Sequence, residues 1–279
     1  MHSHWGTERG HPADAEQRRL RKANWNSEVR QVSEDEMCEH FREQNVRVML
    51  DLHYPKFLPL EQMRPIHDYA LDVQKANQDV VLGHWIHIDP RTGEAGLDEL
   101  RRCVGESPGL IGFGVSGSGT VPASDPAYEP FLRYCSRERV PVLVFLGTTA
   151  YGAGKPAGGG VLIDHCHPRH LDFVAASYPD LKIVAGRPAW PWQAEANAVL
   201  LHKRSVWYEL HGWSPKYHDP ELKREISRRL QDRIMFGADY PMLSYERLER
   251  EWRAEGYSEE VLEKVFWRNA ERFLAQLGR

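Results

Sequence analysis

The chain has 279 residues, of which 41% are hydrophobic and 27% charged, a balance typical of a globular protein with a sizeable core. A formal net charge of −4 gives no general affinity for nucleic acid, and no apolar run is long enough to span a membrane. The four cysteines form no C-x-x-C pair and no signal peptide is evident, so we expect reduced thiols in a cytoplasmic protein.

The first residues read Met1-His2-Ser3-His4. Side chains alternate along an extended strand, so His2 and His4 lie on the same side of it. Together with a distant carboxylate on another strand end, two such imidazoles can form a metal site. A first barrel strand needs about five residues, and only Met1 precedes His2. We therefore expect this strand to be short, or truncated at its start.

Apolar, β-rich runs then alternate with helix signals along the chain. Helix starts are indicated by a capping box from Ser33 to Glu36, by Pro168, by Asp219 before Pro220, and by Ser258. The glycine-rich segment 147–160 predicts a long loop at the active face. Seven strands are predicted, at Val46–Leu52, Val80–Ile88, Leu110–Val115, Val140–Leu146, Lys182–Ala185, Val206–Leu210 and Ile234–Gly237.

Repeated strand–helix units predict a parallel sheet, and eight of them close a barrel when the segment at His2–His4 is counted as the first strand. The expected fold is α/β, a single distorted (β/α)8 TIM barrel over residues 1–279. An open, doubly wound sheet is the rival interpretation. It is disfavoured because no glycine-rich phosphate loop opens an early helix.

Several motifs, in this order and spacing, resemble the amidohydrolase superfamily over nearly the whole chain. The resemblance is to the branch of aminocarboxymuconate-semialdehyde decarboxylase and the hydroxybenzoate decarboxylases. It implies a distorted barrel with a metal ion at its C-terminal mouth, bound by His2 and His4 from the first strand and Asp239 from the eighth. The motifs are His2-Ser3-His4, His167-Pro168-Arg169-His170-Leu171-Asp172, Tyr178-Pro179-Asp180-Leu181-Lys182-Ile183-Val184, Trp190-Pro191-Trp192 and Gly237-Ala238-Asp239-Tyr240-Pro241.

Two positions depart from the family pattern. Thr148 stands after the fifth strand, and Arg187 after the sixth, where family members usually carry histidines. A guanidinium neither binds a metal nor serves as a base near neutral pH. It can clamp a substrate carboxylate, or it can pair with a buried acid such as Glu209.

Further residues are candidates for the barrel mouth. His211, just past the seventh strand, is either a replacement base or ligand or a structural histidine. Thr148, Arg187 and Trp190 are the candidate substrate-binding residues, although Trp190 is more typical of a core or an interface. Five other histidines are each more often structural than catalytic: His53, His84 and His87 near strand ends, and His165 and His167 in the loop before the helix at Pro168.

The leading hypothesis is a metal-dependent hydrolase or decarboxylase acting on a small organic carboxylic acid. Zinc is the default ion, with manganese or iron as alternatives. In hydrolysis Asp239 or His211 takes the proton, and Arg187 steers the carboxylate in either reaction. We expect a homo-oligomer such as a dimer, or a hetero-oligomer with a homologue, and no nucleic-acid or membrane partner.

Two other hypotheses remain open from the sequence. The loss of two expected histidines is consistent with a non-catalytic or accessory subunit that stabilises a catalytic homologue. A dinuclear iron or manganese oxygenase of the same superfamily needs more ligands than the motifs supply. Two metal ions per chain would support that reading.

Overall fold

Seven parallel strands form a curled sheet in which each strand pairs with the next one along the chain. The computed structural model describes residues 1–12, 15–26 and 30–278. Every strand boundary falls within two residues of its predicted position, which confirms the (β/α)8 fold class. The strands are β1 Val48–Leu52, β2 Val81–His87, β3 Leu110–Val115, β4 Val142–Phe145, β5 Ile183–Gly186, β6 Val206–Glu209 and β7 Ile234–Met235.

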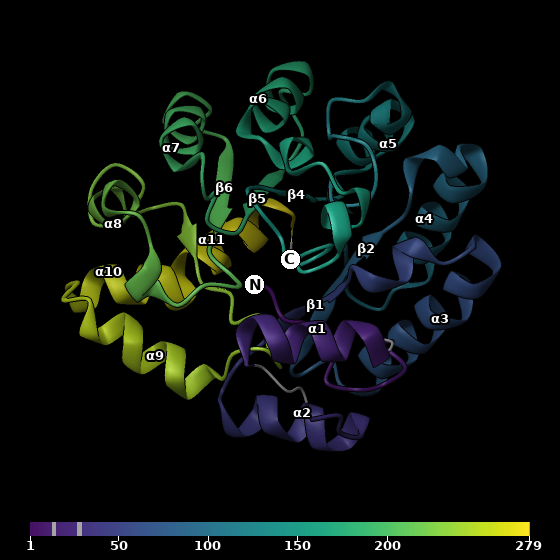
Figure 1. Ribbon diagram of the computed structural model, residues 1–279, viewed down its shortest axis with the longest axis horizontal. Coiled ribbons are helices and arrows are strands. Elements are labelled where there is room, and N and C mark those ends of the chain that lie inside the picture. The colour runs from purple at the N-terminus through teal and green to yellow at the C-terminus, as the bar shows by residue number, and fades with distance from the viewer. Residues whose placement is uncertain (13–14, 27–29, 279) are drawn as a thin grey trace.

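The helices surround the sheet as an outer ring (Figure 1). Ser33 caps α2 in the predicted capping box, Asp219 caps α8, and Ser258 caps α10. None of the helices in the described ranges is long and apolar enough to cross a membrane. The helices are α1 Ala15–Trp25, α2 Glu34–Glu43, α3 Leu60–Ala76, α4 Glu94–Glu106, α5 Glu129–Glu138, α6 Pro168–Ser177, α7 Gln193–His202, α8 Pro220–Ile226, α9 Tyr245–Ala254, α10 Glu259–Glu263 and α11 Asn269–Gln276.

The first residues of the chain lie along β1 inside the ring of helices (Figure 1). The Ser3 N–H donates to the Met49 carbonyl at 3.2 Å, and the Asp51 N–H donates to the Ser3 carbonyl at 2.8 Å. These bonds make a single parallel bridge beside β1. The first strand is therefore as short as the sequence predicts.

The same segment also bonds to the chain that follows β7. The Ala238 N–H donates to the His2 carbonyl at 3.1 Å, and the His4 N–H donates to the Tyr240 carbonyl at 2.6 Å. Residues 2–4 thus bridge the two edges of the seven-stranded sheet. This closure carries the two N-terminal histidines to the mouth of the barrel.

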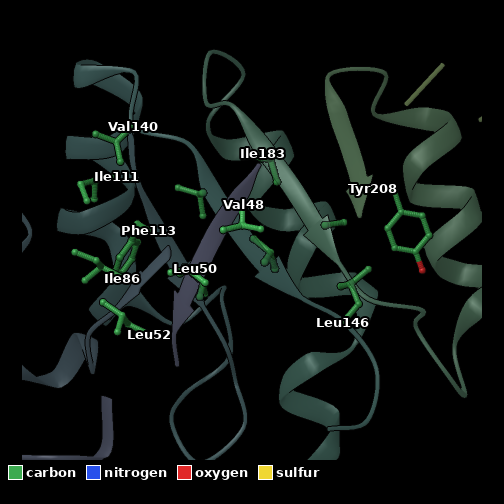
Figure 2. Close-up of a cluster of buried hydrophobic side chains, with 14 of the residues drawn as sticks. Val48, Leu50, Leu52, Ile86, Ile111, Phe113, Val140, Leu146, Ile183 and Tyr208 are labelled. Atoms are coloured by element: carbon green, nitrogen blue, oxygen red, sulfur yellow. The ribbon is translucent and has the colours of Figure 1, made fainter. Parts of the chain in front are cut away.

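Alternation along the strands separates two hydrophobic layers. One layer packs between the strands and the helices, and Figure 2 shows part of it, including Val48, Leu50 and Ile183. The other layer points inward and is capped by a side chain of α11. Its buried members include Met49, Trp85, Leu143, Val184, Trp207, Met235 and Phe273. On each strand, the residue two positions after the inward-facing one also points inward. It lies nearer the C-terminal end of the strand and faces the barrel mouth.

Candidate metal centre

The three residues predicted as metal ligands lie together at the mouth. His4 Nε2 is 3.0 Å from Asp239 Oδ1, and His2 Nε2 is 3.6 Å from the same oxygen. One donor atom from each residue lies within 4.8 Å of the other two. Ligands bound at about 2.0–2.2 Å around one ion stand at such separations. The fold therefore brings together residues that are more than 230 positions apart in the chain.

Four polar atoms of this cluster are buried without a hydrogen-bonding partner. Both ring nitrogens of His2, Nδ1 of His4 and Oδ1 of Asp239 are buried without a hydrogen bond. An unsatisfied buried polar group costs about 1–3 kcal/mol. A divalent cation would satisfy these atoms, and two imidazoles with one carboxylate suit zinc, manganese or iron. The residues present therefore fit the metal ion that the barrel resemblance implies.

Protonation favours ligation at two of the three positions. Burial, reinforced by the neighbouring His211, lowers the pKa of His2 well below its usual value. Burial opposes charge on Asp239, but His4 outweighs that effect and lowers the pKa of this carboxyl. Conversely, burial alone would lower the pKa of His4, whereas the Asp239 carboxylate raises it. His2 is therefore neutral and Asp239 ionised at neutral pH, the states in which they bind metal.

The backbone holds two polar side chains at the mouth in an uncommon conformation. Asp239 has φ of 62° and Arg187 has φ of 67°, both in the left-handed region. Such positions cost on the order of 1–3 kcal/mol for residues other than glycine, and they cluster at functional sites. A Cβ on Gly212 would lie 3.3 Å from both Arg187 Nη2 and Asp239 Oδ2. The guanidinium and the carboxylate therefore converge on the same glycine.

Arg187 is not used to neutralise Glu209. Its backbone N–H donates to the Glu209 backbone carbonyl at 2.8 Å, yet no ion pair joins the two side chains in the part of the chain that the structure describes. The Nε atom of Arg187 is buried without a hydrogen-bond partner. One donor of the guanidinium is therefore left without a partner.

Glu209 binds His211 instead. The Nδ1 atom of His211 is hydrogen-bonded to the Glu209 carboxylate, and both side chains are buried. The His211 ring stacks on the His2 ring with centroids 3.6 Å apart and planes 6° from parallel. His211 thus lies at the centre of the mouth, beside the candidate ligands, with its orientation set by a carboxylate.

Three further residues lie at the mouth: Asp51, which was not predicted, and His53 and His87, for which the sequence favoured a structural role. Asp51 follows Met49 on the inward face of β1, His53 comes just after the end of that strand, and His87 follows Trp85 on the inward face of β2. His87 Nε2 is 3.1 Å from Asp51 Oδ2, which in turn is 3.7 Å from His2 Nε2. The signal for these residues was the period-two alternation, which places them inward in register with the buried layer.

Two predicted substrate-binding residues lie apart from the hydrogen bonds of this cluster. The Thr148 N–H donates to the Trp190 carbonyl at 2.9 Å, and the Trp190 side chain is 57% exposed. Across the described ranges, no hydrogen bond joins either residue to His2, His4 or Asp239. Their role in binding a substrate stays a prediction.

A parallel α/β barrel with histidine and aspartate side chains gathered at its C-terminal mouth has the architecture of the barrel enzymes, whose active sites lie at that face. The sequence model described as Amidohydrolase matches residues 1–276, so the chain belongs to the amidohydrolase family. This confirms the family resemblance predicted from the motifs. No curated protein matches the sequence.

Solved structures share this fold at low identity. A 2,6-dihydroxybenzoate decarboxylase complexed with 2,6-dihydroxybenzoate is 15% identical, with a TM-score of 0.69 over 98% of this chain and 97% of that one. A dihydroxybenzoic acid decarboxylase from Polaromonas sp. JS666, with bound manganese and the inhibitor 2-nitroresorcinol, is 17% identical, with a TM-score of 0.69 over 99% and 96%. A probable 2-pyrone-4,6-dicarboxylic acid hydrolase from Acinetobacter baumannii, with citric acid bound, is 13% identical, with a TM-score of 0.62 over 98% and 97%.

Proposed function

We propose that this chain is a metal-dependent enzyme that acts on a small organic carboxylic acid, with decarboxylation as the favoured reaction and hydrolysis as the second. The observation that carries the proposal is the convergence of His2, His4 and Asp239, whose buried donor atoms lack partners, beside the free guanidinium donor of Arg187. The family membership supports a metal-dependent hydrolase or decarboxylase in general. The substrate class and the residue roles are inferred from the mouth itself.

Each residue of the mouth has a separate task in this proposal. A divalent ion held by His2, His4 and Asp239 would supply Lewis acidity toward the oxygen atoms of the substrate. Arg187 binds a substrate carboxylate through paired N–H donors and sets its orientation. Glu209 accepts the Nδ1 proton of His211, which leaves the Nε2 atom of that ring to exchange a proton with the substrate.

In decarboxylation, the bond between the carboxyl carbon and its neighbour breaks and its electron pair stays on the neighbour. His211 Nε2 delivers a proton to that carbon, and carbon dioxide leaves. In hydrolysis, the same nitrogen takes a proton from the attacking water. Two of the similar solved structures are decarboxylases, one complexed with 2,6-dihydroxybenzoate and one with the inhibitor 2-nitroresorcinol, which supports testing decarboxylation first.

The test is to incubate the metal-loaded protein with hydroxybenzoic and small dicarboxylic acids in heavy water. Decarboxylation gives carbon dioxide and a product with one deuterium at the carbon that lost the carboxyl group. Hydrolysis in 18O-labelled water instead gives a product with one heavy oxygen. We expect Asp239→Asn to abolish turnover, and His211→Gln to reduce it by 10²-fold or more, on the order of a lost general acid.

His202→Ala is the matched control, because His202 is an exposed histidine at the end of α7. It should turn over substrate as the natural sequence does. A folded, metal-loaded protein that turns over none of these acids would overturn the proposal. That result would support the accessory-subunit hypothesis, which predicts co-purification with a catalytic homologue.

A further inference from the structure

A second group of donor atoms lies beside the first at the barrel mouth. Asp51, His53 and His87 each offer a donor atom within 4.8 Å of the other two. Their side chains are buried, with exposures of 1%, 7% and 1%. We propose that these three residues bind a second divalent first-row transition-metal cation, with the Asp51 carboxylate placed between the two ions.

This second group also has buried polar atoms without a partner. Asp51 Oδ1, His53 Nδ1 and His87 Nδ1 are all buried without a hydrogen bond. A buried polar atom without a partner is unfavourable and rare in folded proteins. Two imidazoles and one carboxylate around a small space make a donor set that a transition-metal cation would satisfy.

The Asp51 carboxylate lies between the two groups of donor atoms. Its Oδ2 is 3.1 Å from His87 Nε2 on one side and 3.7 Å from His2 Nε2 on the other, while its Oδ1 is 3.9 Å from His4 Nδ1. The carboxylate therefore faces ligands of both groups. In two-metal sites the ions stand about 3.5–4 Å apart, a separation that one carboxylate can bridge.

The neighbouring strand β3 leaves room for the His87 ring through a glycine. A Cβ on Gly114 of β3 would lie 2.1 Å from the His87 Nε2 atom, closer than any real contact. Only glycine at this position lets the imidazole lie across β3 toward the interior of the barrel. The strand is thus shaped around an inward-pointing histidine.

A single ion accounts for fewer of these observations. If Asp51 were only a fourth ligand of the first ion, with His87 orienting it, the buried Nδ1 of His53 would still lack a partner. The nearby Lys56 ammonium donates to the Ser118 carbonyl at 2.9 Å and makes no bond to His53 Nδ1. A second ion gives His53 a function.

The second site rests on the proposed metal centre for its neighbouring ion, but its own ligands are different, so the two can be tested separately. The full chain is stripped with a chelator, reloaded with manganese alone, dialysed and analysed for metal per chain by mass spectrometry. We expect two manganese ions in the natural sequence, and one in His53→Ala and in His87→Ala. Electron paramagnetic resonance spectra of the bound manganese should show exchange coupling between two ions only in the natural sequence.

The controls separate loss of a site from loss of the fold. His202→Ala removes an exposed histidine outside the mouth and should retain two ions. His53→Gln keeps the side-chain size and should retain one ion, so it decides the matter if His87→Ala does not fold. A single ion in the natural sequence, unaffected by His53→Gln but lost in Asp239→Asn, would overturn the second site alone. Failure of the natural sequence to bind manganese would contradict both sites.

Discussion

At the scale of single residues, the mouth depends on glycines that leave space for functional side chains. A Cβ on Gly237 would lie 1.6 Å from Glu209 Oε1 and 3.0 Å from the Cβ of His211. The carboxylate that orients His211 therefore occupies the volume that any other residue would need. This explains why a glycine stands two residues after the end of β7.

We predict that Gly237→Ala displaces Glu209 and breaks its bond to His211. Overpacking a buried site costs about 1–3 kcal/mol, and turnover should fall with it because His211 loses its orientation. Urea unfolding and steady-state kinetics measure the two effects. Gly105→Ala in α4 is the control, because nothing lies within 4 Å of its added Cβ. Equal behaviour of the two variants would contradict the packing argument.

Part of this site was predictable from individual residues of the sequence. The His-x-His spacing and the late Asp239 predicted a cluster that the fold does bring together. Asp51 was missed because a lone acid in Leu50-Asp51-Leu52 interrupts an apolar run, and only the barrel register shows that it points inward. The stacking of His211 on His2 was not predictable either, since it depends on how the barrel closes.

At the scale of elements, α3 and α4 are joined by a buried carboxylate. Glu99 of α4 accepts a bond from His67 Nδ1 of α3 at 2.8 Å, and Arg102 donates to both of its oxygens at 2.7 and 3.0 Å. Burial alone would raise the pKa of Glu99, but these bonds lower it to about 2. With every oxygen paired, this cluster ties two helices together and is not a metal site.

We predict that Glu99→Gln destabilises the protein by about 3 kcal/mol at pH 7, because it removes the buried charge that pairs with Arg102 and bonds to His67. The folded-state pKa lies below the unfolded one, so this stabilisation is complete above about pH 4.5 and is lost as the pH falls toward 2. The difference in unfolding free energy between the natural sequence and the variant should shrink over that range.

Glu106→Gln is the matched control for this prediction. Glu106 contacts the same arginine from the same helix, at 2.7 Å from Arg102 Nη1, but it is exposed. An exposed pair of this kind contributes about 0–1 kcal/mol. Urea unfolding at pH 7, 4 and 3 compares the two variants, and a pH-independent effect of Glu99→Gln would argue against a charged clamp.

At the scale of the whole molecule, residues 2–4 both close the barrel and carry two candidate ligands. The strands and helix starts were predictable because alternation and capping are local signals. The closure of the barrel was less predictable, because a segment of three residues is too short to show a strand pattern. Its place is fixed by bonds to β1 and to the segment after β7, which are distant in sequence.

We predict that Ser3→Pro destabilises the protein by about 3 kcal/mol and reduces metal binding, since proline removes the N–H that donates to Met49. Ser3→Ala retains that N–H and loses only the two bonds of the hydroxyl, to the His2 carbonyl at 2.9 Å and to the Tyr245 hydroxyl at 2.6 Å, so it should cost about 1–2 kcal/mol. Thermal unfolding and metal analysis test the pair. Normal metal content in a folded Ser3→Pro would contradict the link between closure and the site.

The central claim is that the first and last strand positions of the barrel together hold a metal ion. The most direct measurement is an anomalous-difference map from crystals grown with zinc, with data collected at the zinc absorption edge. We predict a peak at about 2.0–2.2 Å from donor atoms of His2, His4 and Asp239. A map from zinc-containing crystals with no peak between these three side chains would contradict it.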